Sequence, residues 1–184
     1  PLHETTLAQR VELLGNTHPD TLVSRNNLAS AYESAGDLER AIPLYETTLA
    51  QRVELLGNTH PSTLTSRNNL AYAYESAGDL ERAIPLHETT LAQRVELLGN
   101  THPDTLVSRN NLASAYESAG DLERAIPLYE TTLAQRVELL GNTHPDTLIS
   151  RNNLASALKA AKAEQHSDTA TGGISSGSLS PPPP

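Results

Sequence analysis

The chain has 184 residues, no cysteine, and a formal net charge of −9 from 22 acidic and 13 basic residues. Because it offers no basic stripe to neutralise phosphates, nucleic acid and anionic membrane surfaces are excluded as expected partners. Its acidity mildly favours basic partners, although solubility alone is a sufficient explanation for it. The lack of cysteine excludes disulfides and thiolate metal sites, and no apolar run reaches the roughly 18 residues of a membrane-spanning helix.

The sequence repeats itself with a period of 42 residues, since residues 1–42 return letter for letter at 85–126. Residues 43–84 are a near-copy, and a fourth copy begins at Pro127 and holds until Ala157. A fixed period in this range predicts a repeat array, in which each unit covers an apolar face of its neighbour. Function in such arrays lies along a shared surface, so a binding module is expected rather than an enzyme.

In chain order, the chain opens inside a second helix of a unit, and the next helical pattern begins at Pro19 and ends before Gly36. Proline suits a first helical position, where its missing N–H has no partner in any case. Thr17 or His18 would be the N-cap, and Asp20 suits the positive end of the helix dipole. Gly36 supplies a left-handed residue that stops the helix. The positions that recur at helical spacing are Leu28, Ala29, Tyr32 and Ala35.

The second pattern of the unit begins after Asp37, its expected N-cap, and ends at Gly57. Pro43 lies in its second turn, where it removes one backbone hydrogen bond. We call the two elements helix A, of roughly 16 residues, and helix B, of roughly 19. The prediction is an all-α array of about eight helices that starts in a helix B and ends in a helix A. The apolar positions of this helix B are Leu38, Ala41, Ile42, Tyr45, Leu49, Val53 and Leu56.

The fourth helix A departs from the other copies, because Leu158 replaces a tyrosine and Lys162 replaces the glycine that stops the helix. Strong helix formers follow, so this helix is expected to run to about Gln165 and to face water as an end unit. Residues 166–184 consist largely of Ser, Gly, Thr and Pro and are expected to be disordered. The predicted array is therefore residues 1–165, divided into units 1–42, 43–84, 85–126 and 127–165.

The run NNLASAYESAGDLERAIPLYETTL, residues 26–49, resembles the tetratricopeptide repeat. The 42-residue length, the THPDT entry and the AIPLYE segment are similar to the kinesin light chain variety, which also occurs in bacterial proteins. The resemblance implies a right-handed α-solenoid of antiparallel helix pairs, whose helices A line a concave groove that binds a peptide or partner protein. Residues that occupy the positions typical of the family are Leu28, Ala29, Tyr32, Gly36, Ala41 and Tyr45.

Val23, Asn26, Ser30 and Glu33 share one face of helix A, at spacings i, i+3, i+7 and i+10. The resemblance places this face in the groove, where a row of asparagines, one in each unit, would hydrogen-bond the backbone of an extended peptide with micromolar affinity. Neighbouring positions vary between copies and would select its sequence. The predicted groove residues are Val23, Asn26, Ser30, Glu33, Thr65, Asn68, Tyr72, Glu75, Val107, Asn110, Ser114, Glu117, Ile149, Asn152 and Ser156.

Histidines invite a metal interpretation, but four of them recur once per unit at the start of a helix A. Equivalent atoms of stacked units lie on the order of 10 Å apart, too far to converge on one zinc ion at about 2.1 Å. His3 and His87 occupy the slot of Tyr45 and Tyr129 and are expected to pack between helices. Ser, His and Asp occur in every unit, which argues against a single catalytic arrangement. No catalytic, metal-binding or cofactor-binding residue is therefore predicted.

Two alternatives to a peptide-binding scaffold remain open. The first is self-assembly, because the opening helix B lacks its own helix A and leaves Leu7, Val11 and Leu14 uncovered, and end-to-end contacts of this kind form fibres. The second is a sensor or oligomerisation arm of a larger bacterial signalling ATPase. The sequence contains no methionine, so a longer parent chain is expected, and the expected location is the cytoplasm.

Overall fold

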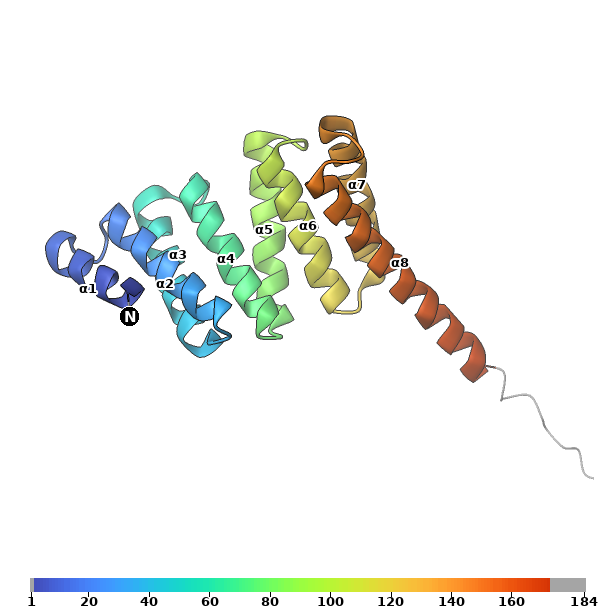
Figure 1. Cartoon of the computed structure of the whole chain (residues 1–184), viewed down its shortest axis with the longest axis horizontal. Helices are drawn as coiled ribbons and strands as arrows, with labels where there is room; N and C mark the ends of the chain where they lie inside the picture. The colour runs from blue at the N-terminus through green and yellow to red at the C-terminus, as the bar shows by residue number, and fades with distance from the viewer. Residues whose placement is uncertain (1, 173–184) are drawn as a thin grey trace, which may run out of the picture.

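The computed structural model describes residues 2–172 of the chain, and the side chains of residues 2–166. Within this part, eight α-helices stand side by side in a row, and each packs against the next in antiparallel pairs (Figure 1). Their bounds are α1 (Leu2–Leu14), α2 (Pro19–Ser34), α3 (Leu38–Leu56), α4 (Pro61–Ser76), α5 (Leu80–Leu98), α6 (Pro103–Ser118), α7 (Leu122–Leu140) and α8 (Pro145–Gly172).

The structure confirms the all-α prediction, because no strand occurs among residues 2–172. The helices A are α2, α4, α6 and α8, and the helices B are α1, α3, α5 and α7. Complete helices have the expected lengths, 16 residues for α2 and 19 residues for α3. The described part thus opens with a helix B and closes with a helix A.

Local hydrogen bonds set both ends of helix A. His18 is the N-cap of α2, and its Nδ1 accepts a hydrogen bond of 3.2 Å from the Asp20 amide. At the other end Gly36 has a φ of 77°, in the left-handed region. Its amide donates to the Glu33 carbonyl at 2.8 Å, and the Asp37 amide donates to the Tyr32 carbonyl at 2.9 Å, the two bonds of a Schellman motif. The chain therefore leaves α2 through a turn of two residues, Gly36 and Asp37, and Asp37 is the N-cap of the next helix, α3.

The apolar core is shared between neighbouring units. Tyr45 of α3 is buried against Ala29 of α2 and belongs to the same cluster as Leu70 and Tyr74 of α4. Successive helices A also touch, α4 with α6 and α6 with α8. Since each unit completes the core of the one beside it, the stability of a unit depends on its neighbours.

Six arginines are buried between the helices, each at most 7% exposed. In the first of two types, Nη1 of Arg52 donates to the Ser62 carbonyl at 3.0 Å and to Ser66 Oγ at 2.7 Å, which ties α3 to α4. In the second, Arg67 Nη2 donates to Asn58 Oδ1 at 3.0 Å. Burial lowers the pKa of Arg52 and of Arg67, and none of the six pairs with a carboxylate among the described residues. The six are Arg25, Arg52, Arg67, Arg94, Arg109 and Arg136.

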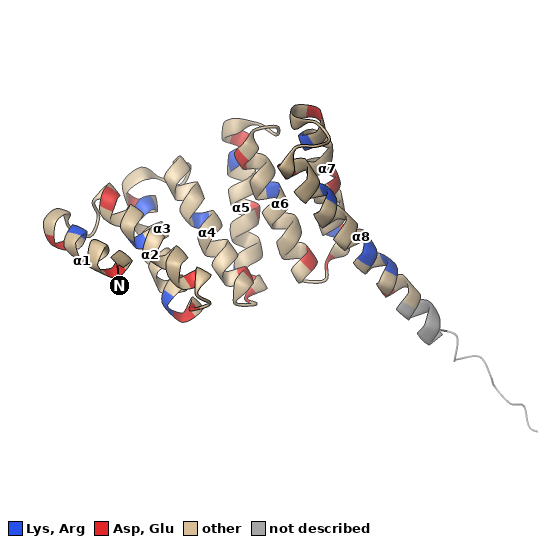
Figure 2. Ribbon diagram, in the orientation of Figure 1, with Lys and Arg blue, Asp and Glu red and all other residues tan. Residues whose placement is uncertain are grey.

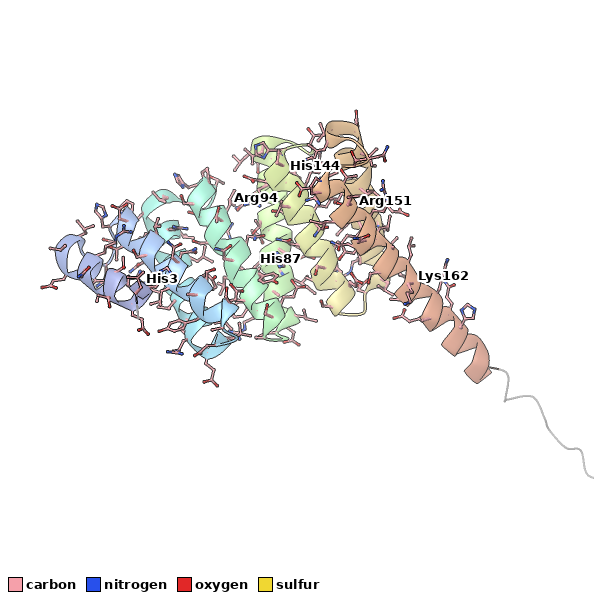
Figure 3. The ribbon with its side chains drawn as sticks, in the orientation of Figure 1. His3, His87, Arg94, His144, Arg151 and Lys162 are labelled. Atoms are coloured by element: carbon pink, nitrogen blue, oxygen red, sulfur yellow. The ribbon has the colours of Figure 1, made fainter. Side chains whose placement is uncertain are left out.

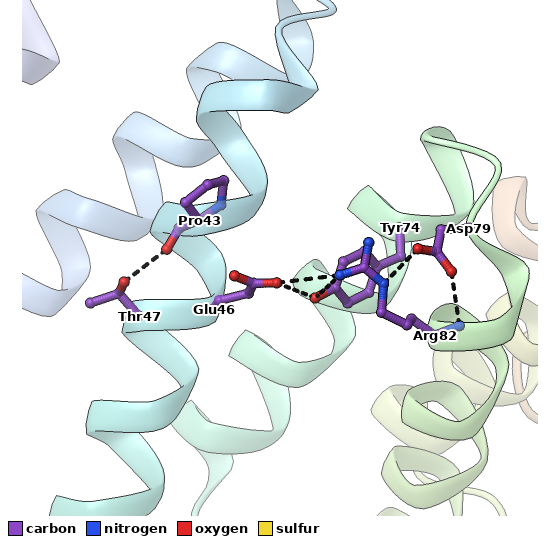
Figure 4. Close-up of polar contacts among 6 residues, drawn as sticks. All are labelled: Pro43, Glu46, Thr47, Tyr74, Asp79 and Arg82. Atoms are coloured by element: carbon purple, nitrogen blue, oxygen red, sulfur yellow. Dashed lines mark hydrogen bonds and ion pairs between the residues drawn. The ribbon is translucent and has the colours of Figure 1, made fainter.

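A polar cluster holds each turn between helix A and helix B (Figure 4). The Arg82 guanidinium lies over the Tyr74 ring, 4.1 Å from its centroid, and pairs with Asp79. The Tyr74 hydroxyl donates to Glu46 of the preceding helix, α3, and Glu46 Oε1 lies 3.6 Å from Arg82 Nη1. Figure 4 also shows Thr47 Oγ1 bonded to the Pro43 carbonyl at 2.8 Å. The three helices α3, α4 and α5 are thus joined by one cluster of polar contacts.

Acid should weaken these turns. The hydrogen bond from Arg82 holds the pKa of Asp79 below its ordinary value of 3.8. The carboxylate therefore stabilises the fold above that ordinary value, and the contribution disappears as the pH falls through the lower pKa of the folded state. We expect Asp79→Asn to destabilise the array at neutral pH and to make its thermal midpoint less sensitive to acid between about pH 5 and 2.

Circular dichroism melts at each pH would measure this effect, with Glu81→Gln on the same turn as the control. An equal response to acid in the Asn variant and the parent chain would show that the Asp79 bond does not contribute.

Helix α8 extends further than the sequence predicted. The expected end at Gln165 is wrong, because residues 166–172 continue the helix as far as Gly172, and the boundary of the expected disordered tail moves accordingly. Adding residues to an existing helix is far easier than starting one, since each residue fixed brings one hydrogen bond. The remainder of that tail, residues 173–184, lies outside the described part.

Candidate interaction surfaces

The predicted groove positions form rows across the helices A. Their apolar members are exposed on successive helices: Val23 on α2 is 43% exposed, Tyr72 on α4 53% and Ile149 on α8 51%. Thr65 and Val107 are exposed at the position of Val23. A side chain available to a partner therefore recurs at each helix A.

The asparagine row is linked from unit to unit. The Oδ1 of each of the first three predicted asparagines accepts a hydrogen bond from the second asparagine of the next unit, and these bonds link neighbouring helices A. Because these side-chain carbonyls are engaged, the groove asparagines are left with their Nδ2 groups to offer a peptide. The pairs are Asn26 with Asn69 at 3.2 Å, Asn68 with Asn111 at 3.0 Å, and Asn110 with Asn153 at 3.0 Å.

The predicted glutamates are half-buried and also join neighbouring units. Glu117 Oε1 accepts from Ser156 at 3.1 Å, and its Oε2 accepts from the Tyr129 hydroxyl at 2.9 Å. Glu75 Oε1 likewise accepts from Ser114 at 2.9 Å. These glutamates therefore form part of the junctions between neighbouring helices A.

The junction between the first two helices A differs, because Tyr72 stands where other units have serine. Glu33 Oε2 accepts from the Tyr45 hydroxyl at 2.8 Å, but Glu33 Oε1 is buried with no hydrogen-bond partner among the described residues. Burial raises the pKa of Glu33. At this junction the half-exposed ring of Tyr72 therefore stands in place of the serine hydroxyl that donates a hydrogen bond to the glutamate at the other junctions.

His87 is fully buried in α5 (Figure 3), as predicted for a helix-packing slot. Its Nε2 lies 3.5 Å from Glu75 Oε2, and neither ring nitrogen has a hydrogen bond. The same prediction is wrong for His3, which is exposed on α1 because no helix A covers that face among the described residues.

A row of apolar cavities lies at the edge where helices B end and helices A begin. The first has a volume of about 490 Å³ and is lined in part by Val23, Leu55 and Leu56. Equivalent cavities of about 260 and 290 Å³ follow at the next two units. The sequence prediction missed the leucine pairs, although the repeated ELLG segment places two leucines directly before a helix stop. These pairs are Leu55 and Leu56, Leu97 and Leu98, and Leu139 and Leu140.

Charged side chains and histidines have structural roles in this array. Acidic residues lie mainly towards the helix ends (Figure 2), and His144 repeats the capping contact of His18, with its Nδ1 3.2 Å from the Asp146 amide. No group of three or more His, Asp or Glu side chains in the described part is placed to hold a metal ion. None of the described helices combines the length and apolarity needed to cross a membrane.

The architecture is that of an α-solenoid built from helix hairpins. The sequence matches the tetratricopeptide repeat family over residues 1–52, 28–94, 68–136 and 110–166. The chain therefore belongs to the tetratricopeptide repeat family, whose domains generally mediate protein–protein interactions.

Solved structures of similar arrays support this assignment. The nearly identical repeats of a putative kinesin light chain from Podosopora anserina are 33% identical, with a TM-score of 0.77, and the match covers 91% of this chain and 80% of that one. BtubC (BKLC) from P. vanneervenii is 27% identical, with a TM-score of 0.75, over 100% of this chain and 76% of that one. No curated protein matches the sequence.

Proposed function

We propose that this array is a non-catalytic scaffold that binds an extended segment of a partner polypeptide along the face of its helices A. The observation that carries the proposal is the recurrence of exposed side chains and asparagine amides at matching positions of α2, α4, α6 and α8. An extended peptide presents a carbonyl at regular intervals, which suits a row of donors held at fixed spacing.

The linked asparagine pairs favour this function. Ordering a flexible side chain opposes binding, and the pairing of Asn68 Oδ1 with Asn111 has already restricted the rotation of the Asn68 amide. Its Nδ2 group is therefore oriented before a peptide arrives. A peptide hydrogen bond to each of a few such amides, at about 0.5–1.5 kcal/mol each, leads to micromolar affinity after the cost of association.

Tyr72 provides the site most able to discriminate between peptides. Its ring is half exposed, whereas the other units carry a serine at this position. Partial burial of an aromatic ring under a partner side chain would add about 1–2 kcal/mol. We therefore place the strongest contact at the junction between α2 and α4.

We expect a variant with both Asn68→Ala and Tyr72→Ala to bind peptides at least tenfold more weakly than the parent array. A library of displayed 12-residue peptides is selected on the immobilised parent chain, and synthetic copies of the enriched peptides are titrated into both proteins by calorimetry. Tyr72→Ser alone should account for much of the loss, and it introduces the residue that three sister units carry, so the fold should tolerate it.

Glu81→Ala, on exposed surface of α5, is the control and should leave affinity unchanged. Circular dichroism verifies that every variant keeps its helix content. Equal affinity of the enriched peptides for the parent and the double variant would refute binding at this face.

A further inference from the structure

The first apolar cavity differs from its two counterparts in one respect. The first and third cavities share threonine, proline, leucine, valine and arginine at equivalent positions of their linings. The lip of the first carries Ser62 and His60, whereas the third has Asp146 at the position of Ser62. The second has Asp104 there and Thr65 in place of valine. Only the first of the three combines valine in its wall with a lip that lacks a carboxylate.

A buried positive charge lines this cavity. Arg52 is 7% exposed, and its Nη1 is held by the Ser62 carbonyl at 3.0 Å and by Ser66 Oγ at 2.7 Å. Its Nε and Nη2 groups form no hydrogen bond, and its charge forms no ion pair, among the described residues. In the other two cavities Asp104 and Asp146 act on Arg94 and Arg136 through space. No carboxylate lines the first cavity, so the charge of Arg52 is the least compensated of the three.

The walls beside this charge are aliphatic and accessible. Leu55 is 49% exposed, Leu56 41% and Val23 43%, and all three line the cavity. A volume of about 490 Å³ falls within the range of small-molecule sites. The cavity thus presents a wide apolar surface with a single guanidinium, which pairs well with a carboxylate by two parallel hydrogen bonds.

From these features we propose that the cavity between α2, α3 and α4 binds an aliphatic carboxylate, a medium-chain fatty acid anion, with its carboxylate on Arg52 and its chain along Leu55, Leu56 and Val23. The site shares Val23 with the predicted groove, but none of the asparagines lines it. Asp at position 62 would place a second negative charge beside the ligand, and for this reason the second and third cavities do not take it.

Calorimetric titration of the full chain with sodium octanoate at constant ionic strength tests this assignment. We expect one site per chain with a dissociation constant of about 0.1–1 mM, as suits a ligand of this size. Acetate, which lacks the chain, and octylammonium, which carries the opposite charge, should not compete.

Two substitutions that copy residues of sister units probe the specificity without disturbing the fold. Ser62→Asp introduces the residue found at Asp20, Asp104 and Asp146, and it should weaken octanoate binding about tenfold by repulsion of one charge at short range. Asp146→Ser removes the carboxylate from the lining of the third cavity and should raise the stoichiometry from one site to two.

Several results would overturn the proposal: no octanoate binding, equal binding to the Ser62→Asp variant, or an unchanged stoichiometry in the Asp146→Ser variant. Competition by octylammonium would show that apolar contact alone holds the ligand, and competition by acetate would show that charge alone does. Either outcome would also contradict the assignment. Peptide binding is measured with different variants, so a negative result with octanoate would contradict the cavity assignment and not the proposed peptide binding.

Discussion

Replacing Tyr45 by alanine is expected to lower the free energy of unfolding of the array by about 3–5 kcal/mol. The side chain is 1% exposed and fills the space between α2, α3 and α4 beside Ala29 and Leu70. Its removal leaves a cavity, and it also takes away the hydroxyl that donates to Glu33 Oε2. With Glu33 Oε1 already lacking a partner, the half-buried carboxylate would lose its remaining hydrogen-bond donor among the described residues.

Urea titration followed by circular dichroism measures this loss as a shift of the unfolding midpoint. Tyr72→Ala is the matched comparison, because it removes an equally large ring that is half exposed on the next helix A. It should change stability by less than about 1 kcal/mol. Similar losses for the two variants would mean that Tyr45 does not form part of the core.

The second large effect should be a gain, because replacing His87 by tyrosine is expected to stabilise the array by about 1–3 kcal/mol. In the two equivalent slots the hydroxyls of Tyr45 and Tyr129 bond to a glutamate at 2.8 and 2.9 Å. At His87 the corresponding Glu75 Oε2 and both ring nitrogens are buried without a hydrogen bond. Tyrosine would supply the missing donor and remove the two unsatisfied nitrogens.

The reverse change provides the control for this prediction. Tyr129→His should destabilise its own junction by a similar amount, because it recreates the unpaired atoms one unit further along. Thermal melts rank the two variants against the parent chain, and hydrogen exchange at α5 and α7 shows whether each effect is local. A stability of His87→Tyr equal to or below that of the parent would contradict the role given to the missing hydrogen bond.

Local features of the sequence were enough to predict the helices and their order. Pro19 and Gly36 restrict the backbone at the positions they occupy, so the start and stop of helix A follow from chemistry within a few residues. The sequence offers both Thr17 and His18 as the N-cap of this helix. In the structure His18 is the N-cap, because its side chain accepts a hydrogen bond from the Asp20 amide. Helix α8 is longer than the sequence predicts, because an existing helix can be extended past Gln165 by residues that carry no strong helix preference.

The surface was harder to predict, because its properties depend on contacts between units. Arginine is normally exposed, and nothing local indicates that Arg52 turns inward to bond Ser66 of the next helix. Glu75 was expected on the groove face, yet its bond to Ser114 draws it partly into the junction. The cavity at Leu55 and Leu56 forms only where a second unit closes it, so one repeat read alone does not reveal it.

The burial of six arginines has a consequence for the electric field around the molecule. Almost half of the 13 basic side chains are withdrawn from the surface, while most of the 22 acidic ones stay in contact with solvent. The net charge of −9 would draw in a positively charged polypeptide at low ionic strength, and the charged side chains that it meets first would be mostly acidic. At physiological salt, where the screening length is about 8 Å, this long-range attraction fades, and encounter rates should drop far more than the lifetimes of the complexes.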